Sequence, residues 1–175
     1  MVQYKVITPA DVPVVLALQA RCYGPQFLEN AQAFEAKLQA AAGLHCSFLA
    51  LDEREPARAL GYIISLPVQG HQLPELNAQA LPAAARPCTL YLHDLAVSPE
   101  GRSQRVGAAL LQQVIGRARD MGLQHMALVA VQGSTAYWER HGFEAVNDAL
   151  PSGVRRHLSS FGPQACYMRR ALRPH

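Results

Sequence analysis

Apolar and polar positions recur along the chain with two periods, a period of two typical of strands and a period of 3.6 typical of helices. Strand patterns occupy residues 3–8, 46–52, 58–66, 89–97, 125–131 and 164–172. Helical patterns begin after the cap Thr8-Pro9-Ala10-Asp11 and also occupy residues 29–42, 104–121 and 134–141. Because a helix separates the strands at 89–97 and 125–131, these strands should be parallel, with a right-handed crossover. The earlier strands can pair antiparallel, so we predict one α/β domain over residues 1–175, with helices covering a mixed sheet.

The stretch 67–88 has neither pattern. It contains Pro67, Pro74, Pro82 and Pro87 and few paired apolar residues. Proline fixes φ and removes a backbone donor, so we interpret the stretch as an ordered loop. Loops of this length are either plain surface connections or functional lids, and the sequence leaves both interpretations open.

Composition and charge narrow the classes of function. The chain has 175 residues, of which 50% are hydrophobic and 17% charged, a balance typical of a globular domain. Its 16 Lys and Arg exceed its 13 Asp and Glu by only three. No arginine-rich run is interleaved with aromatic residues, so we predict no nucleic-acid partner. The small positive excess is compatible with a small anionic ligand.

Metal binding and membrane insertion also find no support in the sequence. The chain's cysteines are Cys22, Cys46, Cys88 and Cys166, and none belongs to a C-x-x-C pair. The histidines show no ligand spacing, so we predict no metal site. The N-terminal stretch MVQYKVITPADV lacks the apolar core of a signal peptide, and no apolar run reaches the ~18 residues that span a membrane. We therefore expect a cytoplasmic protein with reduced thiols and no membrane partner.

A candidate anion site lies where a strand gives way to a helix. Residues 102–111 read RSQRVGAALL and follow the turn Ser98-Pro99-Glu100-Gly101. A helix N-terminus exposes unpaired amides and a partial positive charge, to which anions bind. The candidate anion-binding residues are Arg102, Ser103, Gln104, Arg105, Val106, Gly107 and Ala108. The stretch is neither a P-loop nor a dinucleotide fingerprint, and an ordinary helix cap with solvated arginines would give the same pattern.

These residues and a second motif resemble the GNAT N-acetyltransferase superfamily. The stretch Arg102–Gly107 resembles its motif A, Gln/Arg-x-x-Gly-x-Gly/Ala, whose amides hold the pyrophosphate of acetyl-CoA. Arg105 replaces the first glycine, and we expect its Cβ to require an ordinary helical φ. The stretch 137–143, YWERHGF, resembles motif B, and the last predicted strand resembles the family's usual ending. The resemblance covers most of the chain.

The resemblance implies a GNAT-like mixed, splayed sheet covered by helices on both faces. Acetyl-CoA would lie between the strands at 90–97 and 125–131. The amides of Leu95, Ala96 and Val97 would hold its pantetheine arm, and that of Leu95 would polarise the thioester carbonyl. Ser134 and Trp138, from the motif B region, are assigned to the same cofactor site.

Direct attack of an amine on the thioester, as in GNAT enzymes generally, needs a base. His93 is the candidate, because the ordinary pKa of histidine is about 6.5 and because the family often carries a base on this strand. Strand alternation should put Tyr91, His93 and Leu95 on one face and Asp94 on the other. Asp94 matches a neighbouring acidic position of some family members. The alternative is a structural His-Asp pair that holds a loop.

The acid that protonates the departing thiolate is harder to assign. The family position falls on Trp138, whose indole donates a hydrogen bond but does not protonate a thiolate. Tyr137 is one step away, about 100° around a helix, and is our candidate. Otherwise Tyr137 packs in the core, with Ser134 as a weaker candidate, or the reaction needs no acid.

The sequence thus predicts an N-acetyltransferase that uses acetyl-CoA as co-substrate and acts on a primary amine of a small molecule or peptide. Small members of the family often form homodimers, so a homodimer is possible. Arg155, Arg156 and His157, within the segment 151–161, could favour an acceptor with a carboxylate, although a solvated basic surface explains them equally well. Arg105 and Trp138 keep a second hypothesis open, a non-catalytic acyl-CoA-binding or sensor module with a GNAT fold.

Overall fold

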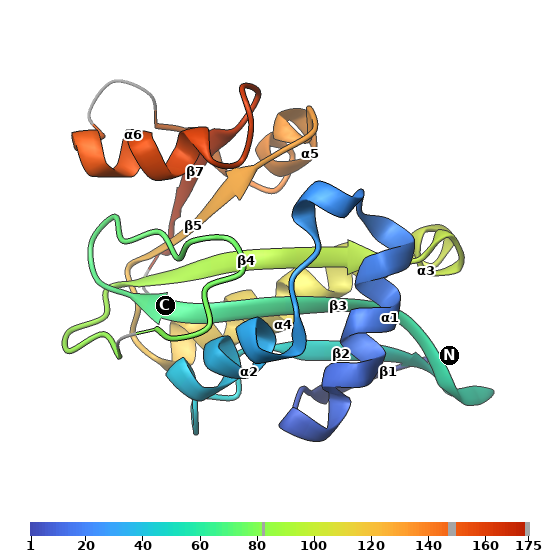
Figure 1. Ribbon diagram of the computed structural model, residues 1–175. Helices are drawn as coiled ribbons and strands as arrows, with labels where there is room; N and C mark the ends of the chain where they lie inside the picture. The colour runs from blue at the N-terminus through green and yellow to red at the C-terminus, as the bar shows by residue number, and fades with distance from the viewer. Residues whose placement is uncertain (82, 147–149, 174–175) are drawn as a thin grey trace.

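A computed structural model describes residues 1–81, 83–146 and 150–173 (Figure 1). The strands are β1 (Val2–Val6), β2 (Phe48–Asp52), β3 (Glu55–Val68), β4 (Thr89–Val97), β5 (His125–Ala130), β6 (Glu144–Ala145) and β7 (Cys166–Ala171). The α-helices are α1 (Val12–Cys22), α2 (Ala31–Ala40), α3 (Pro99–Ser103), α4 (Val106–Asp120), α5 (Thr135–Glu139) and α6 (Ser152–Ser159). Short 3-10 turns, η1 (Pro9–Asp11) and η2 (Pro25–Phe27), precede and follow α1.

The strands form one mixed sheet in the order β1-β2-β3-β4-β5-β7-β6. The first four strands pair antiparallel, β4 and β5 pair parallel, and β7 lies antiparallel between β5 and β6. This pairing confirms the predicted mixed sheet and its parallel pair. Three elements were not predicted: α3, β6 and α6. The first two have only five and two residues, and α6 has only two apolar residues, Val154 and Leu158, too few for a recognisable period.

Helices cover both faces of the sheet, as predicted (Figure 1). On one face, α1 and α2 bury Val15, Leu18 and Phe34 against Tyr62 and Ile64 of β3. On the other face, α4 buries its apolar stripe against the same central strands. The buried residues of that stripe are Val106, Leu110, Leu111, Val114, Ile115 and Ala118. Burial of apolar surface on both faces supplies the main stabilisation of the central strands.

The sheet splays between its two central strands. Pairing of β4 with β5 runs from Thr89 and His125 to Leu92 and Leu128 and then stops. Beyond this point β4 continues beside β3 to Val97, whereas β5 continues beside β7 and leaves the plane of the first strands (Figure 1). The splay confirms the GNAT-like sheet and leaves one edge of β4 open.

A bulge interrupts β4 just where the splay begins. Ile64 of β3 pairs with Asp94, and the next residue of β3 pairs with Leu92, so His93 is an extra residue without a partner on β3. The predicted alternation of faces through His93 is therefore wrong. His93 and Asp94 both turn towards the layer of α2, where they meet Glu29 and Tyr62.

Candidate active site

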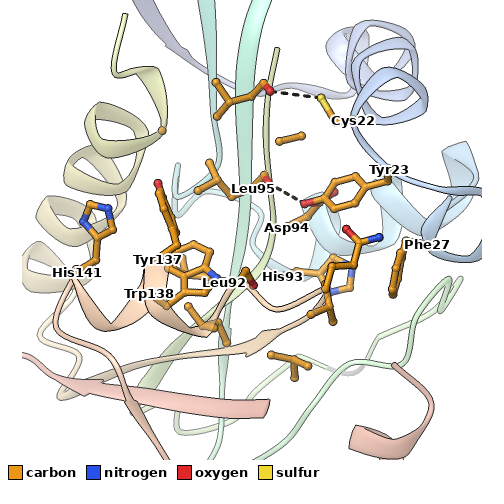
Figure 2. A pocket seen from close by; sticks show the side chains of 18 of the residues that line it. Cys22, Tyr23, Phe27, Leu92, His93, Asp94, Leu95, Tyr137, Trp138 and His141 are labelled. Carbon is orange, nitrogen blue, oxygen red and sulfur yellow. Dashed lines mark hydrogen bonds between the residues drawn. The ribbon is translucent and has the colours of Figure 1, made fainter. Parts of the chain in front are cut away.

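A cavity of about 800 Å³ opens where β4 and β5 diverge, a volume within the usual range for ligand pockets. Figure 2 shows Tyr137, Trp138 and His141 on one side of β4 and Tyr23 and Phe27 on the other. Most of the predicted site residues line this cavity. They are His93, Leu95, Ala96, Val97, Arg102, Arg105, Gly107, Ala108, Ser134, Tyr137 and Trp138.

The start of α4 presents unpaired amides to the cavity, but fewer than expected. The extra helix α3 uses the amides of Arg102, Gln104 and Arg105 for its own turn. The first bond of α4 runs from the Ala109 amide to the Arg105 carbonyl. The three amides of residues 106–108 are therefore left without helical partners in the described chain.

Three candidate anion-binding residues do not line the cavity. The side chains of Ser103 and Gln104 donate to the Glu100 carbonyl instead, at 2.8 and 3.3 Å. Val106 is fully buried in the core beneath α4, so only its backbone can reach an anion. The helix that was predicted from residue 104 begins at Val106, because the turn of α3 occupies the preceding residues.

Arg105 caps α4 in the left-handed conformation, with φ +58° and ψ +30°. We expected its Cβ to require an ordinary helical φ, and this expectation is wrong. The left-handed region costs a residue with a Cβ roughly 1–2 kcal/mol relative to the right-handed one. The backbone thus keeps the conformation that glycine adopts readily, while Arg105 and Arg102 add positive charge at the cavity.

Gly107 allows the ring of Tyr137 to approach the start of α4. A Cβ at position 107 would lie 2.9 Å from the Tyr137 hydroxyl, closer than side chains tolerate. Burial raises the pKa of Tyr137 and the charge of Arg140 lowers it, and burial has the larger effect. The phenol is therefore protonated at neutral pH and can donate a proton or a hydrogen bond.

The two neighbouring aromatic residues of α5 have different positions. Trp138 is buried and packs edge-on against Phe143, with ring centroids 5.6 Å apart. Tyr137 is half-buried at the cavity wall. The structure thus gives the core position to Trp138 and leaves the hydroxyl of Tyr137 at the cavity.

The open edge of β4 offers backbone groups to a ligand. The Tyr23 hydroxyl donates to the Leu95 carbonyl at 2.7 Å, and the Cys22 thiol lies 3.6 Å from the Val97 carbonyl (Figure 2). A strand residue presents its N–H and its C=O to the same neighbour, so the amides of Leu95 and Val97 also face the gap. Ala96 faces β3, since its carbonyl lies beside Gly61. Of the three predicted amides, two therefore point into the opening.

A buried ionic cluster that the sequence did not predict holds His93. Glu29 accepts hydrogen bonds from Lys37 Nζ at 2.9 Å and from the Asn77 amide at 2.7 Å, and it lies 2.6 Å from His93 Nε2. The side chains of Lys37 and Glu29 are 0% and 2% exposed. Burial alone would raise the pKa of Glu29, but the hydrogen bonds and charges of His93 and Lys37 outweigh it and lower this pKa to about 2. The buried side chain of Gln19 also binds the Glu29 backbone: its Nε2 donates to the Glu29 carbonyl, and its Oε1 accepts from the Glu29 amide.

The partner of His93 is therefore Glu29 and not Asp94. Glu29 holds Nε2, while Nδ1 is buried without a hydrogen-bond partner in the described chain. Tyr62 donates a short hydrogen bond to Asp94, whose pKa is raised mainly by burial. The two adjacent residues of the bulge thus belong to separate polar clusters.

The loop after β3 is ordered by contacts with the site. Its residues 69–81 and 83–88 contain no helix or strand, and Pro82 lies outside the described residues. Asn77 bonds to Glu29, and Leu76 lines the cavity. Within 151–161, Phe161 lines the cavity, whereas Arg155 and Arg156 are exposed and lie outside the lining.

The described residues include no candidate metal site and no helix that could span a membrane. No group of three or more His, Cys, Asp or Glu among them could hold a metal ion. No described helix combines the length and the apolar character that a bilayer crossing requires.

The sequence matches a known protein family, and the fold matches solved structures. Residues 13–143 match the model of the acetyltransferase (GNAT) family. The GphF GNAT-like decarboxylase, in complex with isobutyryl-CoA, has a TM-score of 0.72 and 18% identity, covering 98% of this chain and 100% of that one. The ribosomal-protein-S18-alanine N-acetyltransferase of Escherichia coli has a TM-score of 0.67 and 15% identity, covering 100% and 96%. None of the curated protein sequences matches the chain. Identities this low show a shared fold.

Proposed function

Since the chain belongs to the acetyltransferase (GNAT) family, we propose that it transfers an acetyl group from acetyl-CoA to a primary amine. The main support is the open edge of β4, which adjoins the unpaired amides and arginines at the start of α4. Together they offer backbone donors for an extended arm and positive charge for phosphates. In this proposal the amides of residues 106–108 and the side chains of Arg102 and Arg105 bind the pyrophosphate. The amides of Leu95 and Val97 bind the pantetheine arm.

The chain's own residues supply the steps of acyl transfer. The Leu95 amide donates to the thioester oxygen as negative charge develops there. His93, which lines the cavity and whose Nε2 is held by Glu29, is the proposed acceptor of the amine proton. The amine nitrogen bonds to the acetyl carbon, the carbon–sulfur bond breaks, and Tyr137 protonates the departing thiolate.

The experiment that tests this proposal has two parts. Isothermal titration with acetyl-CoA and CoA, against ATP as a control, measures binding, and release of free CoA thiol with a panel of primary amines measures transfer. Binding of acetyl-CoA with amine-dependent thiol release supports the proposal. Absence of CoA binding would refute the assignment of the α4 start as a phosphate site.

A second candidate function is an acyl-CoA-binding module without amine acetylation. Its support is that the GNAT-like fold is shared with GphF, a decarboxylase solved with isobutyryl-CoA. The carbon–sulfur bond of the acyl-CoA stays intact in such a protein, so it would bind CoA esters without amine-dependent thiol release. The same two measurements therefore separate the two functions.

A further inference from the structure

The cavity has a second half, on the side of β4 away from α5 (Figure 2). Its walls come from the end of α1, the segment between α1 and α2, and the loop after β3. Tyr23 and Phe27 supply an apolar surface there and meet edge-on, with ring centroids 6.4 Å apart (Figure 2). Leu76, from the loop after β3, and Phe161, from the segment after α6, add apolar side chains to the lining of the same cavity. Aromatic and aliphatic side chains of this kind favour a ligand with an apolar body, because they offer few hydrogen-bond partners to a polar ligand.

The charges that line the cavity are divided between its two halves. Arg102, Arg105 and Arg140 lie on the side of α4 and α5, where the phosphates are proposed to bind. The described lining residues include two carboxylates, Glu29 and Asp94. Glu29 is already matched by a buried ammonium and an imidazole. Asp94 is therefore the group whose charge is still available to a ligand.

Asp94 is a half-buried carboxylate next to the bulge of β4, and its neighbours include the neutral phenols of Tyr62 and Tyr23 and the imidazole of His93. Tyr62 donates to one of its oxygens, and no described Lys or Arg forms an ion pair with it. Burial raises the pKa of Asp94, and the lowering effects of His93, Tyr62 and Tyr23 are smaller, so the carboxylate is incompletely compensated. An ammonium group entering the cavity would supply the missing positive charge next to His93.

We propose that the acceptor is a primary amine with an apolar, preferably aromatic, body and no carboxylate, and that Asp94 binds its ammonium group. The proposal rests on the acetyl transfer proposed above and specifies its acceptor. Tyr23, Phe27, Leu76 and Phe161 hold the apolar body, and His93 lies beside the bound nitrogen.

An acceptor with its own carboxylate would be disfavoured. The positive groups that could pair with it are absent from the described lining of this half, because Arg155 and Arg156 are exposed and lie outside the cavity. Lys37 is fully buried and bonded to Glu29. A carboxylate would therefore meet the like charge of Asp94 and an apolar wall, which we expect to lower kcat/KM about tenfold or more.

Three related amines test the inference on the wild-type protein. 2-Phenylethylamine has the apolar body alone, phenylalanine adds a carboxylate, and phenylalaninamide adds a neutral group of similar size. Thiol release gives kcat/KM at saturating acetyl-CoA, and titration of each amine into the protein saturated with CoA gives binding. We expect phenylethylamine and phenylalaninamide to exceed phenylalanine about tenfold or more in kcat/KM.

A variant pair tests the role of Asp94. Asp94→Asn should lower kcat/KM for phenylethylamine about tenfold or more, mainly through KM, and should reduce the discrimination against phenylalanine. Asp120→Asn is the matched control, because Asp120 is exposed at the end of α4 with its side chain 67% exposed. The wild-type comparison of amines remains decisive if Asp94→Asn does not fold.

The outcomes separate failure of this inference from failure of the proposed function. Phenylalanine equal to or better than phenylethylamine overturns the acceptor class and leaves acetyl transfer standing. CoA binding with neither binding nor reaction of the three amines also overturns it. Absence of CoA binding refutes the proposed function itself, and the acceptor class with it.

Discussion

Replacing Glu29 by glutamine removes the negative charge from the buried cluster with little change in volume. Lys37 would remain fully buried, with the Ala33 carbonyl at 3.3 Å as its described acceptor and no carboxylate to match its charge. Removing one partner of a buried ion pair costs about 3–5 kcal/mol, because the other charge stays buried and uncompensated. We therefore expect Glu29→Gln to lower the free energy of unfolding at neutral pH by about this amount.

The same cluster predicts how this difference changes with pH. The pKa of Glu29 lies at about 2 in the folded protein, below its ordinary value of 4.5, so folding favours the carboxylate. The Glu29 carboxylate therefore stabilises the fold fully at pH values above its ordinary pKa of 4.5, and this stabilisation is lost as the pH falls through its folded-state pKa of about 2. At 1.36 kcal/mol per pKa unit, the lowered pKa of Glu29 contributes about 3 kcal/mol to the free energy of unfolding at neutral pH. This value lies within the range expected for Glu29→Gln.

The assay is urea denaturation of the wild type, Glu29→Gln and Glu35→Gln, followed at several pH values between about 7 and 2.5. Glu35 lies exposed on the same helix α2 and serves as the matched control. The gap between the wild type and Glu29→Gln should be about 3 kcal/mol at neutral pH and should shrink below about pH 4.5. A gap that stays constant with pH, or one below about 1 kcal/mol at neutral pH, would refute a role for the Glu29 charge.

Three further substitutions test the other features of the site. Arg105→Gly should raise the free energy of unfolding by up to about 1 kcal/mol, because glycine relieves the left-handed backbone strain. The same variant should weaken CoA binding several-fold in calorimetry, because it removes a positive charge. Unchanged CoA binding would contradict a role for the guanidinium. Gly107→Ala should displace the Tyr137 hydroxyl and lower the rate of thiol release. The control Gly116→Ala, also on α4 but facing open space, should stabilise the protein by about 1 kcal/mol and leave the rate of thiol release unchanged. His93→Gln should lower kcat/KM about 10²- to 10⁴-fold, and a value within about tenfold of the wild type would rule His93 out as the base.

The sequence predicted the regular parts of the fold because their signals are local. The apolar stripe of α4 repeats every three or four residues, and the structure buries it as the pattern predicts. The parallel pairing of β4 and β5 agrees with the helix between them, since adjacent parallel strands need a crossover connection of that kind. The motif residues Arg102, Gly107 and Tyr137 line one cavity, although they come from three separate elements.

The ionic cluster could not be predicted because its contacts are distant in sequence. Glu29 and His93 are separated by 64 positions, and no local pattern links them. A lysine in an amphipathic helix normally lies on the solvent side, so Lys37 gives no sign in the sequence that it is fully buried. Likewise, one inserted residue at the bulge reverses the face of every later position, and an alternating pattern gives no sign of it.

Three features that depart from ordinary rules border the same cavity. His93 sits on a bulge, Arg105 adopts a left-handed backbone, and Glu29 with Lys37 forms a buried ion pair. The bulge and the left-handed backbone cost stability, and strained or charged groups of this kind cluster at functional sites. At Arg105 the cost would disappear with glycine, which adopts the same backbone freely. An arginine at this position is explained if its side chain offsets the strain by binding an anion. Arg105→Gly should therefore raise the free energy of unfolding and weaken CoA binding at the same time.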